Sequence, residues 1–139
     1  MSKKKVLALV AGVVVFMLLI GAGTAYFFLK DRGNKAEEPP TLYNYTIKDY
    51  FVTNVKDSTK LFKASIVLVL NKEGMDAEME ANLPVIRDKI LFILRGLTAD
   101  DLTNPDIQDK LRDKIPTALN QAMGIDNIVS VYFGDFVMQ

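Results

Sequence analysis

The chain contains no cysteine, no histidine and no tryptophan, and the first two absences each exclude a class of chemistry. Without cysteine, neither a disulfide framework nor a thiolate metal site can form. Without histidine, a Ser-His-Asp or Cys-His nucleophile and a histidine-ligated zinc site are excluded. No glycine-rich phosphate loop is present, and the acids Asp76, Glu78 and Glu80 lack the spacing of a calcium loop. We therefore expect no enzyme activity, no metal and no cofactor.

Charge is missing from one long segment near the start of the chain. No side chain from Val6 to Leu29 is charged, and three lysines come directly before this run of 24 residues. As a helix it would extend roughly 36 Å, which is enough to cross a hydrocarbon core about 30 Å thick. Tyr26 is its one ionisable residue, whereas ion pathways need charged groups that face a partner or water. The segment at 6–29 is therefore predicted to be a transmembrane helix that conducts nothing.

A cleaved signal peptide is the alternative interpretation, with Gly23-Thr24-Ala25 as its cleavage site. The apolar cores of signal peptides usually run about 7–15 residues, and this one continues to Leu29. Lysine and arginine are balanced on the two sides of the segment, so their count leaves the orientation open. Because residues 1–5 are too few for a domain, we expect them in the cytoplasm and the rest of the chain outside it.

The net charge of zero hides an asymmetry between the two parts of the chain. Six of the 17 basic residues lie in residues 1–35, where Asp31 is the one acid, and the remainder carries 11 basic and 16 acidic residues, a net charge of −5. An acidic domain without a basic stripe argues against nucleic acid as the partner. Residues 30–41, which contain the pair Pro39-Pro40 near their end, are predicted to be a linker. Residues 42–139 suffice for one small domain.

The hydropathy pattern of that domain predicts an α/β (α+β) fold with the order β-β-α-α-β. Tyr43–Val55 and Leu61–Leu70 are rich in β-branched and aromatic residues and flank a polar turn, which predicts a hairpin. Ile128–Met138 is predicted to be the last strand. Because it is apolar on both faces, we expect it in the centre of a sheet, covered on each side.

Two helical regions are predicted between these strands. Apolar residues recur at spacings of three and four from Met79 to Leu97, within which Pro84 either kinks the helix or marks its first turn. Three further apolar residues lie off this stripe, so a second face is apolar and is covered either within the domain or by a neighbouring subunit; they are Val85, Leu91 and Phe92.

Capping signals divide the region that follows. Thr98 and Asp101 have the spacing of a capping box. Asn104-Pro105 is predicted to begin the last helix, with asparagine as its N-cap. We expect that helix to be broken at Pro116 and to stop at Gly124.

Several short motifs, in this order along the chain, resemble those of the flagellar basal-body FliL family. They are Phe51-Val52-Thr53-Asn54-Val55, Leu83-Pro84-Val85-Ile86-Arg87-Asp88-Lys89-Ile90, Leu97-Thr98-Ala99-Asp100-Asp101-Leu102, Leu111-Arg112 leading to Asn120, and Val131-Tyr132-Phe133 leading to Phe136-Val137-Met138-Gln139. A basic start, one membrane span and a proline-containing linker precede them. The internal Pro116 is a departure from the family pattern.

The resemblance implies a stomatin/SPFH-like domain in the periplasm, anchored in the bacterial inner membrane at the flagellum basal body. It implies a homo-oligomer, a ring around the stator proteins MotA and MotB that supports rotation, swarming and chemotactic motility, and a contact with the basal-body ring protein FliF. The motif residues that become candidates for interaction are Asn54, Pro84, Arg87, Asp88, Leu111, Arg112, Asn120, Tyr132, Phe133, Phe136 and Gln139.

Two other classes of function remain open. A membrane-tethered envelope sensor or ligand-binding module needs no flagellum, and a carboxylate-dependent hydrolase would show a deep pocket lined by two acids. Arg87 and Asp88 are adjacent in sequence and do not face one another on a helix. Each therefore interacts with groups elsewhere. These are either in the same domain or in the solvent, or they lie across a contact with another subunit.

Overall fold

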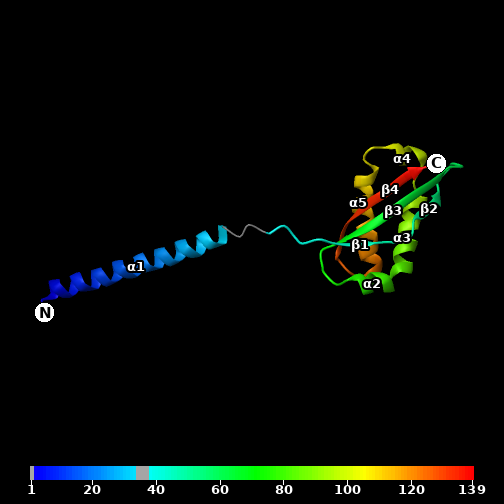
Figure 1. Cartoon of the computed structure of the whole chain (residues 1–139). Coiled ribbons are helices and arrows are strands. Elements are labelled where there is room, and N and C mark those ends of the chain that lie inside the picture. Colours follow the sequence, from blue (N-terminus) through cyan, green and yellow to red (C-terminus); the bar gives the residue numbers. More distant parts are fainter. Residues whose placement is uncertain (1, 34–37) are drawn as a thin grey trace. The chain divides into compact units, whose positions relative to one another are not determined.

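The computed structural model describes residues 2–33 and 38–139, and the chain forms two units, Met1–Pro39 and Pro40–Gln139 (Figure 1). Of the expected linker at 30–41, residues 34–37 lie outside the described residues. Residues 30–33 belong to the preceding helix, and residues 38–42 form no helix or strand. The helix extends beyond the expected 6–29 at both ends because the flanking lysine and arginine residues are good helix formers.

Among its described residues, the first unit contains one helix, α1 (Lys3–Gly33). It is long and apolar enough from Lys3 to Lys30 to cross a membrane, a property that a signal sequence shares. Within the predicted span, residues 6–29, hydroxyl groups occur on Thr24 and Tyr26. The Oγ1 of Thr24 donates to the carbonyl oxygens of Ile20 and Gly21, each at 3.0 Å. The hydroxyl is thus satisfied inside the helix, as an apolar surrounding requires.

The second unit is built on an antiparallel sheet of β1 (Tyr43–Thr46), β2 (Phe51–Asn54), β3 (Leu61–Leu70) and β4 (Ile128–Met138). The predicted hairpin is present, because β2 pairs with β3 across the turn. The predicted strand over 43–55, however, is divided into β1 and β2. Four residues, 47–50, lie opposite only two residues of β3, 65–66, so the ladder is interrupted there.

The strand β4 is not in the centre of the sheet, contrary to the prediction. Among the described residues it pairs only with β3. The opposite edge of β3 is occupied by β1 and β2. In β4, Val129, Tyr132 and Val137 are exposed. An apolar pattern on both faces therefore does not mean burial on both faces here; one face supplies the core and the other remains at the surface.

The helices follow β3 in the order α2 (Asp76–Ala81), α3 (Leu83–Arg95), α4 (Ala99–Thr103) and α5 (Ile107–Met123). Pro84 lies in the first turn of α3, where its missing N–H has no intrahelical partner to lose. The capping box of Thr98 and Asp101 is present at the start of α4. Gly124, with φ of 67°, ends α5 in the left-handed conformation.

Two predictions about α5 are wrong. Asp106, not Asn104, is the residue before the first helical turn; the Oδ1 of Asn104 instead accepts from the Asp106 N–H at 2.9 Å, in a turn that precedes the helix. Pro116 does not break the helix. It is buried, so apolar contact with the core opposes the cost of the hydrogen bond that proline cannot make.

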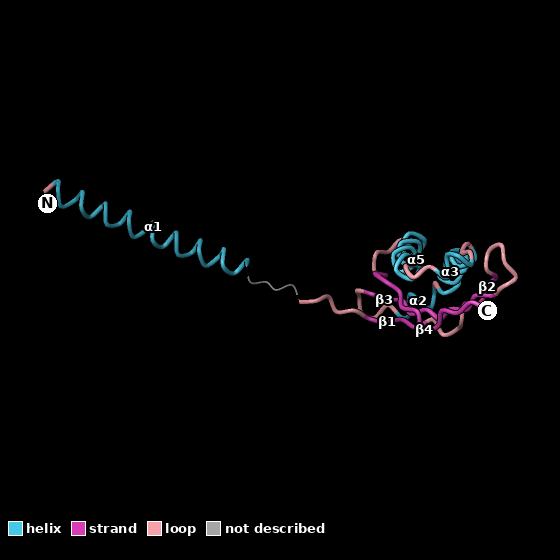
Figure 2. The backbone as a smooth tube through the Cα atoms, turned by 90° about the horizontal axis from the view of Figure 1, so that it is seen from above, coloured by secondary structure: helices cyan, strands magenta, loops and turns pink. Residues whose placement is uncertain are grey.

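The core lies between the sheet and the helices α3 and α5, which cover one side of the strands (Figure 2). Alternate residues of β3 form its floor, and the buried stripes of the two helices form its roof. They include Phe62, Ala64, Ile66, Leu68, Ile86, Ile90, Leu94, Leu111, Ile115 and Leu119. Residues 40–139 therefore form a two-layer α/β structure, in which none of the helices α2 to α5 covers the far side of the sheet.

Candidate interaction surface

Several motif residues make contacts that hold the fold together. Leu111 is buried in the core. The Asn120 side-chain amide donates to the Ile128 carbonyl at 2.8 Å, and its Oδ1 accepts from the Ile128 N–H at 3.1 Å. This double hydrogen bond joins α5 to the first residue of β4. Gln139 exchanges two backbone hydrogen bonds of 2.8 Å with Leu61, which closes the other end of the β3–β4 pair.

The aromatic motif residues near the end of β4 divide between the two faces of the sheet. Phe136 lies 4.7 Å from Phe62 and 5.2 Å from Phe133, ring centre to ring centre, in edge-to-face contacts on the core side. Tyr132 is on the other face and is 48 % exposed. Of these three motif aromatics, Tyr132 is therefore the one best placed for an external contact.

Arg87 makes its contacts inside the domain. Its Nη2 donates to the Tyr50 carbonyl at 3.3 Å, and its guanidinium carbon lies 4.6 Å from the Phe51 ring centre. The Nη1 atom is buried without a hydrogen-bond partner among the described residues. Arg87 thus reaches from α3 to the interruption between β1 and β2. Sequence reasoning also missed the cation–π contact there of Lys63 Nζ, 3.7 Å from the Tyr50 ring centre.

The remaining motif residues lie at the surface. Asn54 is at the exposed end of β2, opposite Leu61, and Pro84 is exposed at the start of α3. Arg112 forms an ion pair of 2.6 Å with Asp109 on the same helix, both partly exposed. Such a pair contributes little to stability. Asp88 lines a groove on the surface of the domain.

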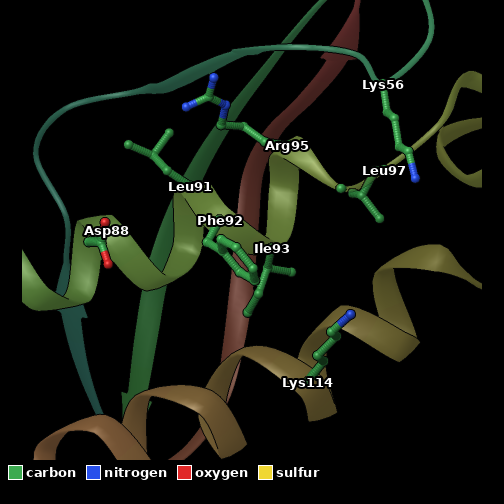
Figure 3. A pocket seen from close by; sticks show the side chains of 9 residues that line it. Lys56, Asp88, Leu91, Phe92, Ile93, Arg95, Leu97 and Lys114 are labelled. Carbon is green, nitrogen blue, oxygen red and sulfur yellow. The ribbon is translucent and has the colours of Figure 1, made fainter.

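The groove lies between α3 and α5 and has a volume of about 660 Å³. In Figure 3, Phe92 and Ile93 extend from α3 toward the side from which Lys114 rises on α5. Lys56 reaches the groove from the turn after β2, because its N–H donates to the Leu97 carbonyl at 3.0 Å. A neighbouring hollow of about 420 Å³ shares Phe92, Ile93 and Lys114 and continues along α5.

Phe92 is the least covered large apolar side chain of the domain, at 78 % exposure. Ile93, the next residue, is only 7 % exposed. The stripe of α3 that packs into the core consists of its four buried residues, Ile86, Ile90, Ile93 and Leu94, and Phe92 is turned away from it. Burial within the domain, one of the two explanations for the second apolar face, is therefore wrong for Phe92 and for Val85, which is 39 % exposed.

The rim of the groove has the opposite charge to the domain that carries it. Residues 40–139 contain 11 basic and 14 acidic residues, a net charge of −3. The groove and its continuation along α5 are lined by five basic and two acidic residues, a net charge of +3. They are Lys56, Lys89, Arg95, Lys110 and Lys114, with Asp88 and Asp113. The sequence alone did not indicate this concentration, since the five cations are spread over three elements.

A second hollow, of about 460 Å³, is lined by Asp76 and Glu80 together with Tyr45 and Lys48. The Tyr45 hydroxyl donates to Glu80 Oε2 at 2.6 Å. Burial and the Glu80 carboxylate raise the pKa of Tyr45 to about 12. Tyr45 is therefore a neutral donor at physiological pH, and Glu80 is already engaged in a structural hydrogen bond. Within residues 2–33 and 38–139, no group of three or more acidic side chains is placed to hold a metal ion.

Comparison with known proteins agrees with the resemblance of the motifs. The family model described as "Flagellar basal body-associated protein FliL" matches residues 44–139. A flagellar protein FliL of Aquifex aeolicus (strain VF5) is 28 % identical over 110 residues, which cover 78 % of this chain and 68 % of that protein. The matched region contains the whole sheet except Tyr43, and all four helices of the domain. The chain therefore belongs to the FliL family of flagellar basal body-associated proteins.

Proposed function

We propose that this protein is a membrane-anchored scaffold of the flagellar basal body, which oligomerises around the stator proteins MotA and MotB and supports rotation under load. Family membership associates the chain with the flagellar basal body. The observation that carries the proposal further is the combination of an apolar helix long enough to span a membrane with a small domain that leaves Phe92 and one face of its sheet uncovered. Uncovered apolar surface is typical of a site of protein contact.

In this proposal α1 crosses the inner membrane once, with residues 1–5 in the cytoplasm and the domain in the periplasm. The anchor keeps the domain close to other membrane proteins of the basal body, FliF among them. Contacts between copies would use uncovered apolar surface, and a ring requires two different surfaces that meet head to tail. Such an assembly supports rotation by binding the engaged state of the stator more tightly than the idle state, which shifts the population toward it. As part of the same proposal, the domain is similar in fold to stomatin/SPFH domains.

An in-frame deletion tests the association with motility. We expect reduced swarming and swimming in viscous medium, restored by the full chain supplied from a second locus. A chain with α1 replaced by a cleavable signal peptide is the matched control, and it should fail to restore motility because it lacks the anchor. Unchanged swimming and swarming in the deletion strain would contradict the flagellar role and favour the envelope sensor.

A second experiment tests the assembly. The full chain, extracted in mild detergent, should co-purify with MotB and elute as a species larger than a monomer by light scattering. A monomer that carries no MotB would exclude the scaffold. The orientation is tested by alkaline phosphatase fused after Gln139, which is active only outside the cytoplasm; an inactive fusion of full length would reverse the proposed topology.

A further inference from the structure

We infer that the groove between α3 and α5 is a docking site for an amphipathic helix of another protein, one whose apolar stripe is flanked by aspartate and glutamate. The inference deepens the proposed function by naming the surface and the chemical class of partner, and to that extent rests on it. It begins with Phe92, whose ring is 78 % exposed beside a groove of about 660 Å³. An exposed aromatic ring next to a groove is the usual anchor of a binding surface.

The shape of the groove favours a helix as its occupant. Its walls are two helices that pack on the same side of the sheet (Figure 2), and its lining continues along α5 past Ala118 and Ala122. The small side chains of these alanines let another helix approach closely. α3 has 13 residues, so a partner helix of about the same length, roughly 20 Å, would lie along the whole groove.

The charge of the rim favours an acidic partner. Five basic residues against two acidic ones surround the apolar floor, in a domain whose net charge is otherwise negative. Figure 3 shows Lys56 and Lys114 on different elements around the same hollow as Phe92. A helix with carboxylates on both sides of its apolar stripe would meet cations from the turn, from α3 and from α5. Complementary charge of this kind increases the association rate and selects against basic partners.

A second copy of this chain does not offer such a helix among the described residues. The acidic helices α2 and α4 have six and five residues and expose no large apolar side chain. The apolar stripe of α5 is buried, and α1 carries no acid within residues 6–29. A contact between two copies of α3 would bring Lys89 and Arg95 of one copy against the same cations of the other.

Peptide binding to the full chain in detergent micelles tests the inference directly. The probes are a synthetic amphipathic helix with glutamate flanks and its twin with the same apolar stripe and lysine flanks, followed by fluorescence anisotropy. We expect the acidic peptide to bind about tenfold or more tightly than its twin, and more weakly as salt rises. Equal binding of the two peptides, or no binding of the acidic one, would overturn the inference.

Variants locate the binding surface. Phe92→Ala should weaken the acidic peptide about tenfold, and Lys114→Glu should weaken it and abolish the preference over the twin. The matched controls are Tyr132→Ala, an exposed aromatic on the open face of the sheet, and Lys72→Glu, an exposed cation before α2. Thermal unfolding followed by circular dichroism verifies that each variant is folded. If the controls weaken the peptide as much as Phe92→Ala does, the site is not this groove.

Cross-linking in the cell identifies the natural occupant. The photoreactive p-benzoylphenylalanine replaces Phe92, or Lys72 as the control position, and mass spectrometry identifies the captured segment. An acid-flanked amphipathic helix of another protein, captured from position 92 only, supports the inference; a second copy of this chain, a lipid or no adduct overturns it. The result is distinguishable from that for the scaffold. If position 92 gives such an adduct but deletion of the gene leaves motility unchanged, only the flagellar role is contradicted. If position 92 gives no adduct and the Phe92→Ala variant has normal motility, only the docking site is contradicted.

Discussion

The helices α1 and α3 both expose large apolar side chains, but in different patterns. In α1 the apolar residues from Val6 to Leu29 are exposed on all sides, so none of the described residues of its unit covers this segment. In α3 the apolar residues that face the sheet are buried, whereas Phe92, which is turned away from the sheet, is 78 % exposed. Uniform exposure calls for a uniformly apolar surrounding such as a bilayer, whereas a local exception calls for a local partner.

The largest loss of stability is expected when a buried aromatic ring is removed, in contrast to the exposed ring of Phe92. Phe62 is fully buried and lies 4.7 Å from Phe136, ring centre to ring centre. Phe62→Ala should lower the free energy of unfolding by about 3–5 kcal/mol, because it leaves a cavity in the core. Urea unfolding of the full chain in detergent, followed by circular dichroism since tryptophan is absent, measures the change. A loss below about 1 kcal/mol would show that the core collapses around the cavity.

The next largest effect is expected on the insertion of α1 into a membrane. Val14→Arg places a charge inside the apolar segment, and a charge at the centre of a span costs about 2.5–3.5 kcal/mol of insertion free energy. We expect a smaller fraction of the chain to resist carbonate extraction from membranes, while the urea midpoint of the domain stays unchanged. Val14→Leu is the control and should insert as the original chain does. Equal membrane retention of the arginine variant would contradict a role for α1 as a single isolated span.

A smaller effect is expected at the start of α4. The Thr98 hydroxyl accepts from the Asp101 N–H at 3.2 Å, and the Asp101 carboxylate accepts from the Thr98 N–H at 2.9 Å. Thr98→Ala should lower the free energy of unfolding by about 1 kcal/mol through the lost cap. Thr98→Ser, which keeps the hydroxyl, is the control. If alanine and serine unfold at the same urea concentration, the capping box does not stabilise the domain.

The hydrogen bond from Tyr45 to Glu80 predicts a dependence on alkaline pH. Folding raises the pKa of Tyr45 from 10.0 to about 12, first through burial and then through the Glu80 carboxylate. A raised pKa means that the stabilisation is fully present below pH 10 and is lost as pH rises through about 12. The urea midpoint of the original chain should therefore fall more between these pH values than that of Tyr45→Phe. Parallel curves would contradict the assignment, and Tyr132→Phe serves as the control.

The smallest effect on stability is expected at Phe92, the counterpart of Phe62. Phe92→Ala removes a side chain that the domain scarcely covers, so the free energy of unfolding should change by no more than about 0.5 kcal/mol. The same urea measurement tests it, with the exposed Val52→Ala as the control. A loss comparable to that of Phe62→Ala would show that Phe92 is packed against the domain in solution, and the contrast between the two rings would be gone.

Local features of the fold could be predicted from the residues themselves. The hairpin of β2 and β3, the bounds of β4, the capping box at Thr98 and the stop at Gly124 all depend on the nature of near neighbours in the chain. The predictions that failed concern contacts between distant segments. Pro116 remains inside a continuous helix and is buried in the fold, and the first strand divides because residues 47–50 lie opposite two residues of β3.

The candidate site was visible in the sequence only in part. Phe92 could be identified as lying off the apolar stripe of its helix, but whether another part of the domain covers it depends on packing. The five basic residues of the rim are far apart in the chain, and only the approach of the turn, α3 and α5 brings them together. Several motif residues, such as Asn120, proved to join elements of the fold.

The sequence by itself determined an apolar helix long enough to span a membrane, the acidic balance of the remainder, the exclusion of histidine and cysteine chemistry, and the local starts and stops of the elements. These follow from composition and from interactions over a few residues. The tertiary structure alone decided that β4 lies at the edge of the described sheet and that Phe92 stands uncovered beside a basic groove. Burial is a property of the whole packed domain, because a side chain is covered only by what the rest of the chain places over it.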